Sequence, residues 1–345
     1  MAWKHQIEPK FRYALFPLAL LYWGITFWRN LFYSMGFFVT RKLPAKVISV
    51  GNITSGGTGK TPAVIYLAKM LLSQGHRVTI LSRGYGRKTA GTQVVTDGKT
   101  PVTDWRNFGD EPTLMANELT GVPIVVDSNR HRGGMVLVDR FNTDIIIMDD
   151  AFQHRAIERD IDIVLINSQD IRATHKLLPY GMLREPWMSL KRADVIIFTK
   201  YNLKKPAPFL RSLARRINRP RLKSRYSIAA PKHIKDSYKI MKPEARMMAV
   251  AAIGDSEGFA RTIKQAGISI VEKMFFMDHY DYTQEDIDQI RDQMKKSNID
   301  AVITTEKDAI KLRGLNLDGI NIFSLGIEFA LHPKAEQSLL NIIQN

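Results

Sequence analysis

The fold is decided by residues 46–61, KVISVGNITSGGTGKT. The β-branched run at 47–50 predicts a buried strand, and the glycines after it predict a tight turn. Residues 60–74 then predict a helix, and residues 77–81 predict a second strand. A strand, a glycine-rich turn and a helix in this order form the context that a phosphate-binding loop requires. The segment therefore predicts a βαβ unit and a parallel sheet.

The glycine-rich turn is the candidate nucleotide site. Backbone N–H groups of such a loop point at phosphate oxygens, and glycine lets the backbone approach closely. We expect Lys60 to reach the β- and γ-phosphates and Thr61 to hold Mg²⁺. The strict motif would place its first glycine at position 54, where this chain has Thr54. A turn with a surface lysine is the alternative. The expected nucleotide-binding residues are Thr54, Ser55, Gly56, Gly57, Thr58, Gly59, Lys60 and Thr61.

Two acidic residues end a later apolar run. Residues 144–150 read DIIIMDD, which predicts a buried strand followed by Asp149 and Asp150. Adjacent buried carboxylates repel each other and are costly unless a cation compensates them. This arrangement is typical of the acidic partner of a phosphate-binding loop, and it predicts a Mg²⁺ site. A structural role is the alternative, and the direct Mg²⁺ ligand is left open between the two.

The remaining pattern predicts two α/β units. Residues 46–220 suit a P-loop NTPase-like, doubly wound parallel sheet, and residues 221–345 suit a smaller α/β domain that closes over the site. Further strands are expected at 93–96, 123–126, 144–148, 162–166, 194–199, 247–253, 269–275, 300–304 and 321–325. Further helices are expected at 112–119, 129–141, 207–217, 256–266, 283–297 and 332–344.

Composition narrows the classes of function. With 345 residues, the chain is long enough for about two domains. Hydrophobic residues make up 45%, which excludes disorder as the main state. The chain has no cysteine, so disulfide scaffolds, cysteine zinc sites and thiol catalysis are excluded, and a reducing compartment fits. The net charge of +16 predicts an anionic partner.

The positive charge is concentrated in two segments. Residues 1–48 carry +6 and residues 204–225 carry +9, so the rest of the chain is nearly neutral. This distribution disfavours a nucleic-acid-binding surface. The first segment fits anionic lipid head groups. The second fits the same membrane or a substrate phosphate, with a solvated helix face as the alternative.

The N-terminal region is apolar and aromatic. Residues 13–28 carry no charge, but 16 residues are too few for a straightforward membrane-spanning helix. The segment also lacks the small-residue cleavage site of a signal peptide. We expect residues 1–45 to form membrane-interfacial helices. A hairpin buried in the core and a single-pass anchor are the alternatives.

Seven sequence blocks together resemble the tetraacyldisaccharide 4′-kinase (lipid A 4′-kinase) family. They run in order from about residue 46 to residue 310. Ala151 is a small departure, because the family pattern has glycine there. The blocks are residues 51–62, 81–87 (LSRGYGR), 109–112 (GDEP), 149–154 (DDAFQH), 181–186 (GMLREP), 276–280 (FMDHY) and 305–308 (TEKD).

The resemblance implies ATP- and Mg²⁺-dependent phosphorylation of the 4′-hydroxyl of a tetraacylated glucosamine disaccharide 1-phosphate. It also implies a peripheral, monotopic enzyme on the cytoplasmic face of the inner membrane. The expected partners are ATP, this lipid A precursor and the membrane surface, with no nucleic acid and no obligate protein partner. A soluble P-loop kinase of another small anionic substrate and a regulatory NTPase remain the alternatives.

The resemblance also implies roles for individual residues. The sequence alone favours Asp110 as a helix cap, whereas the family's base matches Asp110 and its partner matches His279. Arg184 is expected to stabilise charge on the transferring phosphate, and Tyr85 to contact the nucleotide or sugar. Glu185 follows Arg184 and is a candidate substrate-site residue, with a surface ion pair as the alternative. Gln153 and His154 are expected to organise water beside the acidic pair, and no role follows for Lys307.

Overall fold

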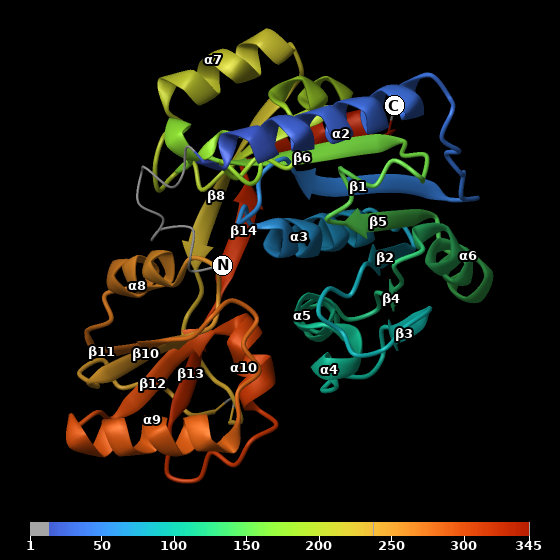
Figure 1. Ribbon diagram of the computed structural model, residues 1–345. Coiled ribbons are helices and arrows are strands. Elements are labelled where there is room, and N and C mark those ends of the chain that lie inside the picture. The colour runs from blue at the N-terminus through green and yellow to red at the C-terminus, as the bar shows by residue number, and fades with distance from the viewer. Residues whose placement is uncertain (1–13, 237, 345) are drawn as a thin grey trace.

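The computed structural model describes residues 14–236 and 238–344, which form two sheets with helices packed on them (Figure 1). The larger sheet has nine strands in the order β14-β8-β7-β6-β1-β5-β2-β4-β3. Its strands are parallel except for β3 and β14, each of which pairs antiparallel with its neighbour. The strands are β1 (Lys46–Asn52), β2 (Val78–Ser82), β3 (Gln93–Thr96), β4 (Ile124–Val126), β5 (Ile145–Asp149), β6 (Ile161–Asn167), β7 (Val195–Thr199), β8 (Arg221–Ile228) and β14 (Ile327–Leu331).

The smaller sheet has five strands in the order β11-β10-β12-β13-β9. Only β9 runs antiparallel within it. The strands are β9 (Lys232–His233), β10 (Met247–Ala251), β11 (Ile270–Phe275), β12 (Ala301–Thr305) and β13 (Ile322–Leu325). The structure therefore confirms the expected α/β class with a second, smaller α/β unit.

Helices connect the strands of both sheets. The sequence pattern located most of them, but it missed α4 and α10, which are too short to show a clear helical period. The helices are α2 (Phe16–Ser34), α3 (Lys60–Ser73), α4 (Trp105–Phe108), α5 (Asp110–Glu118), α6 (Arg130–Phe141), α7 (Pro208–Ile217), α8 (Ser256–Gln265), α9 (Gln284–Lys296), α10 (Glu306–Leu312) and α11 (Pro333–Gln344), with 3₁₀ turns at Arg172–Thr174 and Trp187–Arg192.

The division between the two units differs from the expected boundary at residue 220. Strands β8 and β14 pair with each other and extend the larger sheet, although both lie in the range 221–345. Figure 1 shows these two strands running from the larger sheet toward the smaller one. The chain thus leaves the larger domain after β8 and returns to it with β14 and α11. A pairing between strands about 100 residues apart leaves no local trace in the sequence.

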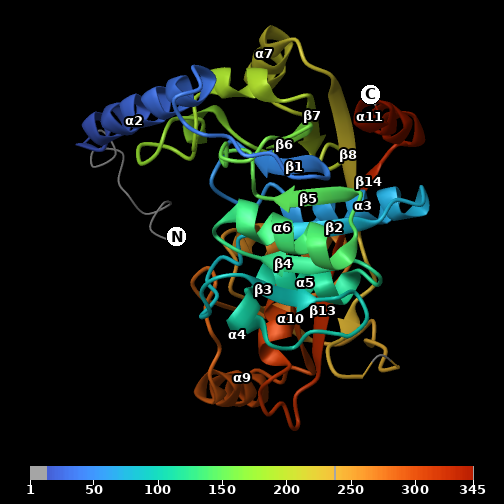
Figure 2. The same cartoon turned by 90° about the vertical axis from the view of Figure 1, so that its right-hand side faces the viewer.

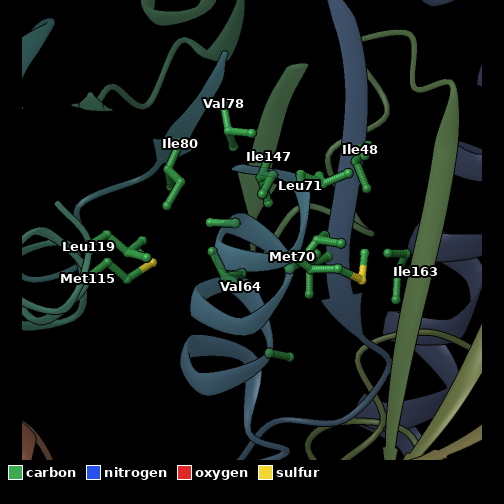
Figure 3. Packing of buried hydrophobic residues seen from close by; sticks show 14 of the residues in the cluster. Ile48, Val64, Met70, Leu71, Val78, Ile80, Met115, Leu119, Ile147 and Ile163 are labelled. Carbon is green, nitrogen blue, oxygen red and sulfur yellow. The ribbon is translucent and has the colours of Figure 1, made fainter. Parts of the chain in front are cut away.

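The core of the larger domain forms around α3 (Figure 3). Val64 and Leu71 of this helix belong to the same buried cluster as Ile48, Ile147 and Ile163 of the three central strands. Helix α3 packs against β1, β2, β5 and β14. This packing fixes the N-terminus of the helix, and with it the glycine-rich loop, at the carboxyl end of β1.

Helix α2 lies on the outside of the larger domain (Figure 2). Of its 19 residues, only Ala19 and Thr26 are buried, so the helix is not the buried hairpin considered as an alternative. Pro17 occupies the first turn, where a missing N–H is tolerated. No helix in the described part of the chain has the length and apolar composition that crossing a bilayer requires. Residues 1–13 of the expected interfacial segment lie outside the described residues.

Candidate active site

The phosphate-binding loop is held open by its neighbours. Gly59 has φ +83°, a conformation that favours glycine, and an added Cβ would lie 1.5 Å from the Tyr226 hydroxyl oxygen. The Asn52 amide donates a hydrogen bond to Thr58 Oγ1 (2.8 Å), and the Thr199 hydroxyl donates to the Thr58 carbonyl (3.0 Å). These contacts tie the loop to the ends of β1, β7 and β8. The loop therefore has the preformed shape that phosphate binding needs.

The entry to the loop is tied to the segment that carries Arg184. Thr54 forms a bridge with Leu183, and the Ser55 amide donates to the Met182 carbonyl at 2.7 Å. The Arg184 amide in turn donates to the Ile53 carbonyl at 2.7 Å. The loop and Arg184 thus share one rigid support, although almost 130 residues separate them in sequence.

Strand β5 brings Asp149 beside the loop. Asp149 lies opposite Val50 of β1 in the parallel register, and its Oδ2 accepts a hydrogen bond from Ser82 (3.1 Å). Its Oδ1 is buried and has no hydrogen-bond partner within the described residues. Burial, followed by the carboxylates of Glu111 and Asp150, raises the pKa of Asp149 to about 6 against the opposing effect of Lys60 and Arg130.

Two cationic side chains, Arg184 and Lys60, contact the Asp150 carboxylate. Arg184 Nη1 lies 2.9 Å from both carboxylate oxygens, and Lys60 Nζ lies 3.6 Å from Oδ1. Burial alone would raise the pKa of Asp150, but Lys60 and Arg184 outweigh it and hold this pKa below its usual range. Asp150 has φ +46°, so the backbone leaves the strand conformation at this residue. The two acids therefore face different partners.

Asp110 and His279 meet across the two domains. His279 Nδ1 lies 2.9 Å from Asp110 Oδ2. The cap alternative for Asp110 is not what the structure shows, because Gly109 holds the N-cap position of α5 and Asp110 is its first residue. Asp110 Oδ1 accepts a hydrogen bond from the Glu111 amide (2.9 Å). The carboxylate therefore faces both its own helix and the smaller domain.

The two lysines near this pair come from α10. Burial alone would raise the pKa of Asp110, but the His279 hydrogen bond and the cations Lys307 and Lys311 hold it below its usual range. The same hydrogen bond is the largest cause of the raised pKa of His279, which burial opposes. Lys307 forms an ion pair with Glu111, the neighbour of Asp110. Sequence reasoning found the block that contains Lys307 but missed Lys311.

Three other expected site residues, Tyr85, Gln153 and His154, have different surroundings. The Tyr85 ring is 66% exposed and its centroid lies 5.3 Å from that of His279, so Tyr85 accompanies the Asp110–His279 pair. The Gln153 amide donates to the Asn52 carbonyl (2.8 Å), which connects it to the end of β1. Burial, followed by Arg130, Arg159 and Arg83, lowers the pKa of His154 to about 4.

Glu185 is fully buried and serves as an anchor. Its Oε1 accepts from Arg29 (2.5 Å), and its Oε2 accepts from Arg192 (2.7 Å) and Asn30 (3.3 Å). Arg29 and Asn30 belong to α2. Neither the expected substrate contact nor the surface ion pair describes this side chain, whose contacts join α2 to the loop that carries Arg184.

The chain matches one protein family over nearly its whole length. The family model for tetraacyldisaccharide-1-P 4′-kinase (LpxK) matches residues 11–344. The tetraacyldisaccharide 4′-kinase of Aquifex aeolicus is 36% identical over 335 residues, covering 96% of this chain and 98% of the relative. The corresponding protein of Halothermothrix orenii is also 36% identical, covering 92% of this chain and 89% of the relative. A crystal structure of LpxK from Aquifex aeolicus in complex with ATP superposes with a TM-score of 0.77 at 34% identity and covers 96% of this chain and 99% of that one.

Proposed function

The chain belongs to the tetraacyldisaccharide-1-P 4′-kinase family, and we propose how its residues carry out the reaction of that family. The protein is an ATP-dependent lipid A 4′-kinase. It transfers the γ-phosphate of ATP to the 4′-hydroxyl of a tetraacylated glucosamine disaccharide 1-phosphate. One observation carries the residue assignment: the 2.9 Å contact between Asp110 and His279, two residues of different domains.

Asp110 is the group that receives the proton of the acceptor hydroxyl. Its lowered pKa keeps the carboxylate ionised, so it accepts a hydrogen bond from the hydroxyl before transfer begins. Most analyses of phosphoryl transfer find a loose transition state, so the hydroxyl loses its proton late. The hydroxyl proton passes to Asp110, and the neutral imidazole of His279, whose Nδ1 lies 2.9 Å away, takes it up from there. The raised pKa of His279 favours the protonated imidazole that results.

Lys60 and Arg184 hold the transferring phosphoryl group. Both cations converge on Asp150, within 3.6 Å and 2.9 Å of its oxygens, at the mouth of the loop. Positive charge placed in advance stabilises the negative charge that spreads over the phosphoryl oxygens in the transition state. The Asp150 carboxylate supports the two cations by contacting both of them.

The donor set at the end of β5 fits Mg²⁺. Asp149 Oδ1 is a buried carboxylate oxygen without a hydrogen-bond partner in the described chain, and Thr61 begins the helix after the loop. Within residues 14–236 and 238–344, no three acidic or histidine side chains are grouped as a self-sufficient metal site. This matches Mg²⁺, which binds one or two protein oxygens together with phosphates and water. Asp149, Asp150 and Thr61 would hold the ion, which supplies charge neutralisation of the phosphates.

A second part of the proposal is that α2 and α7 attach the enzyme to an anionic membrane. The two helices lie at the end of the molecule away from the smaller sheet in both views (Figures 1 and 2). Helix α2 exposes large apolar side chains, including Trp23, Phe27 and Trp28, and α7 carries three arginines in the basic segment 204–225. Apolar and cationic groups on one face are what an interfacial protein needs. ATP in the cytoplasm places this face on the cytoplasmic side of the inner membrane.

Transfer to the lipid acceptor tests the function directly. We expect labelled phosphate to move from ATP to an acylated glucosamine disaccharide 1-phosphate, and we expect Asp110→Asn to lose about 10²- to 10⁴-fold in kcat with a near-normal KM for ATP. ATP consumption that does not depend on the acceptor would favour the NTPase alternative. A kcat for Asp110→Asn within threefold of the wild type would reject the base assignment.

Sedimentation with vesicles tests the membrane contact. The double variant Trp23→Ser/Phe27→Ser should lose binding to phosphatidylglycerol vesicles and keep transfer to a short-chain acceptor. Its control is Ile240→Ser, which removes an even more exposed apolar residue from the smaller domain and should leave vesicle binding intact. Equal binding by the double variant and the wild type would contradict the proposal.

A further inference from the structure

Lys311 is a buried lysine at the contact between the two domains. Its side chain is only 1% exposed. Lysine is almost never this buried unless its charge is paired. Its Nζ lies 3.6 Å from Asp110 Oδ2, donates to the Tyr280 carbonyl (3.1 Å) and lies 5.5 Å from the centre of the Trp105 ring. The ammonium group therefore touches both halves of the site.

The hydrogen bond to Tyr280 fixes the backbone that carries His279. His279 has φ +62°, which is unusual for a residue with a side chain. Its amide donates to the Ala252 carbonyl (3.1 Å), and Lys311 holds the next carbonyl along the chain. A backbone in this conformation persists only where its surroundings hold it. Lys311 thus sets the position from which the imidazole reaches Asp110.

The charged groups around the Asp110–His279 pair distinguish Lys311 from Lys307 by position. Asp110 faces His279, Lys307 and Lys311, with Asp308 of α10 and Glu111 of α5 as the nearby acids. His279 also faces Asp278 at 3.8 Å. Lys307 lowers the pKa of Asp110 more than Lys311 does, but its ammonium forms its ion pair with Glu111. Lys311 is therefore the lysine whose ammonium lies against the Asp110 carboxylate itself.

We propose that Lys311 is a positioning residue of the phosphoryl transfer. Its single ammonium group holds the Asp110 carboxylate and the His279 backbone in register across the two domains. The proposal rests on the proposed role of Asp110 and extends it to a residue that touches neither ATP nor the acceptor. Helix α10, which carries Lys311, is then the element of the smaller domain that completes the site.

The test is the pH profile of kcat/KM in variants of Lys311. Removing a nearby positive charge raises the pKa values of both members of the pair, which titrate together. In Lys311→Met and Lys311→Gln we expect the acidic limb to move upward by about one pH unit. The loss relative to wild type should then be about tenfold greater at pH 6 than at pH 8.5, with an unchanged KM for ATP. Lys311→Arg should restore the limb.

The control is Arg106→Gln, which removes another ion pair between the domains. Arg106 pairs with Asp281, and both side chains are exposed and separate from Asp110. This variant should leave the limb in place. Folding of each variant is checked by thermal unfolding.

Three outcomes would overturn the proposal. The first is an unmoved limb in a folded neutral variant, and the second is a shift of equal size in Arg106→Gln. The third is failure of both neutral variants to fold, which would assign Lys311 to folding alone. An active Asp110→Asn would instead defeat the proposed base.

Discussion

Replacing Glu185 with glutamine should loosen α2 from the catalytic loop. The carboxylate is fully buried and accepts hydrogen bonds from Arg29, Arg192 and Asn30. The Gln side chain has nearly the same shape, but it is neutral and has only one acceptor oxygen. The change therefore removes the charge without opening a cavity, and at least one of the arginines loses its partner.

The size of the effect follows from the burial of the partners. Removing one member of a fully buried ion pair costs about 3–5 kcal/mol, because the other charge is left uncompensated. Here Arg29 is 35% exposed and Arg192 is 19% exposed, so both regain some water. We therefore expect Glu185→Gln to lower the free energy of unfolding of the larger domain by about 2–3 kcal/mol.

Denaturant unfolding, followed by tryptophan fluorescence, measures this loss. Arg29→Gln is the matched control, because it removes the more exposed partner and should cost about 1 kcal/mol. The double variant should cost less than the two single losses together, because both variants break the same contact. A loss below about 0.5 kcal/mol in Glu185→Gln, the size of an ordinary surface substitution, would refute the reasoning. Strict additivity would refute the contact itself.

Three further predictions concern the loop and its surroundings. Lys60→Met should lower kcat/KM by at least about 100-fold, measured by steady-state transfer kinetics, and unchanged kinetics would reject its role at the phosphates. Gly59→Ala should weaken ATP binding at least tenfold in calorimetry, because its Cβ would meet Tyr226 and its φ is positive. Adding Tyr226→Ala to this variant should restore only part of the ATP affinity. Full ATP affinity in Gly59→Ala alone would contradict the loop geometry. His154 has a pKa of about 4 in the fold against its ordinary 6.5, so the unfolded chain takes up a proton first as the pH falls below 6.5. His154→Gln should therefore lose about 1–2 kcal/mol less stability than the wild type between pH 7 and pH 5, and equal pH slopes in thermal unfolding would contradict this.

The parts of the fold that sequence predicts are those with local causes. The glycine-rich loop is set by strand and helix signals within 30 residues, and the acidic pair at 149–150 is set by the apolar run before it. Parallel pairing of β1 and β5 then brings the two together without further information. The apolar and aromatic composition of α2 is visible in the sequence, and the structure leaves most of its side chains uncovered.

The parts that sequence missed depend on distant contacts. No sequence pattern near β8 predicts that β14 pairs with it, because pairing at the edge of a sheet has no periodic signal of its own. The contact between Asp110 and His279 spans 169 residues and was expected only from the family resemblance. Lys311 escaped notice because α10 has seven residues, and a lysine on so short a helix reads as a solvated residue until its burial is known.

The contact between the domains at the site is made by charged side chains. Each domain has its own apolar clusters, whereas the Asp110–His279, Lys311–Asp110 and Lys307–Glu111 contacts are charged. A cavity of about 180 Å³ also lies between residues 102–106 and 310–314, so the facing surfaces are not tightly packed. The Lys311–Asp110 pair is buried, so separating it would leave a charge uncompensated, whereas the exposed Arg106–Asp281 pair contributes little. Because Asp110 and His279 belong to different domains, the pair exists only while this contact is kept.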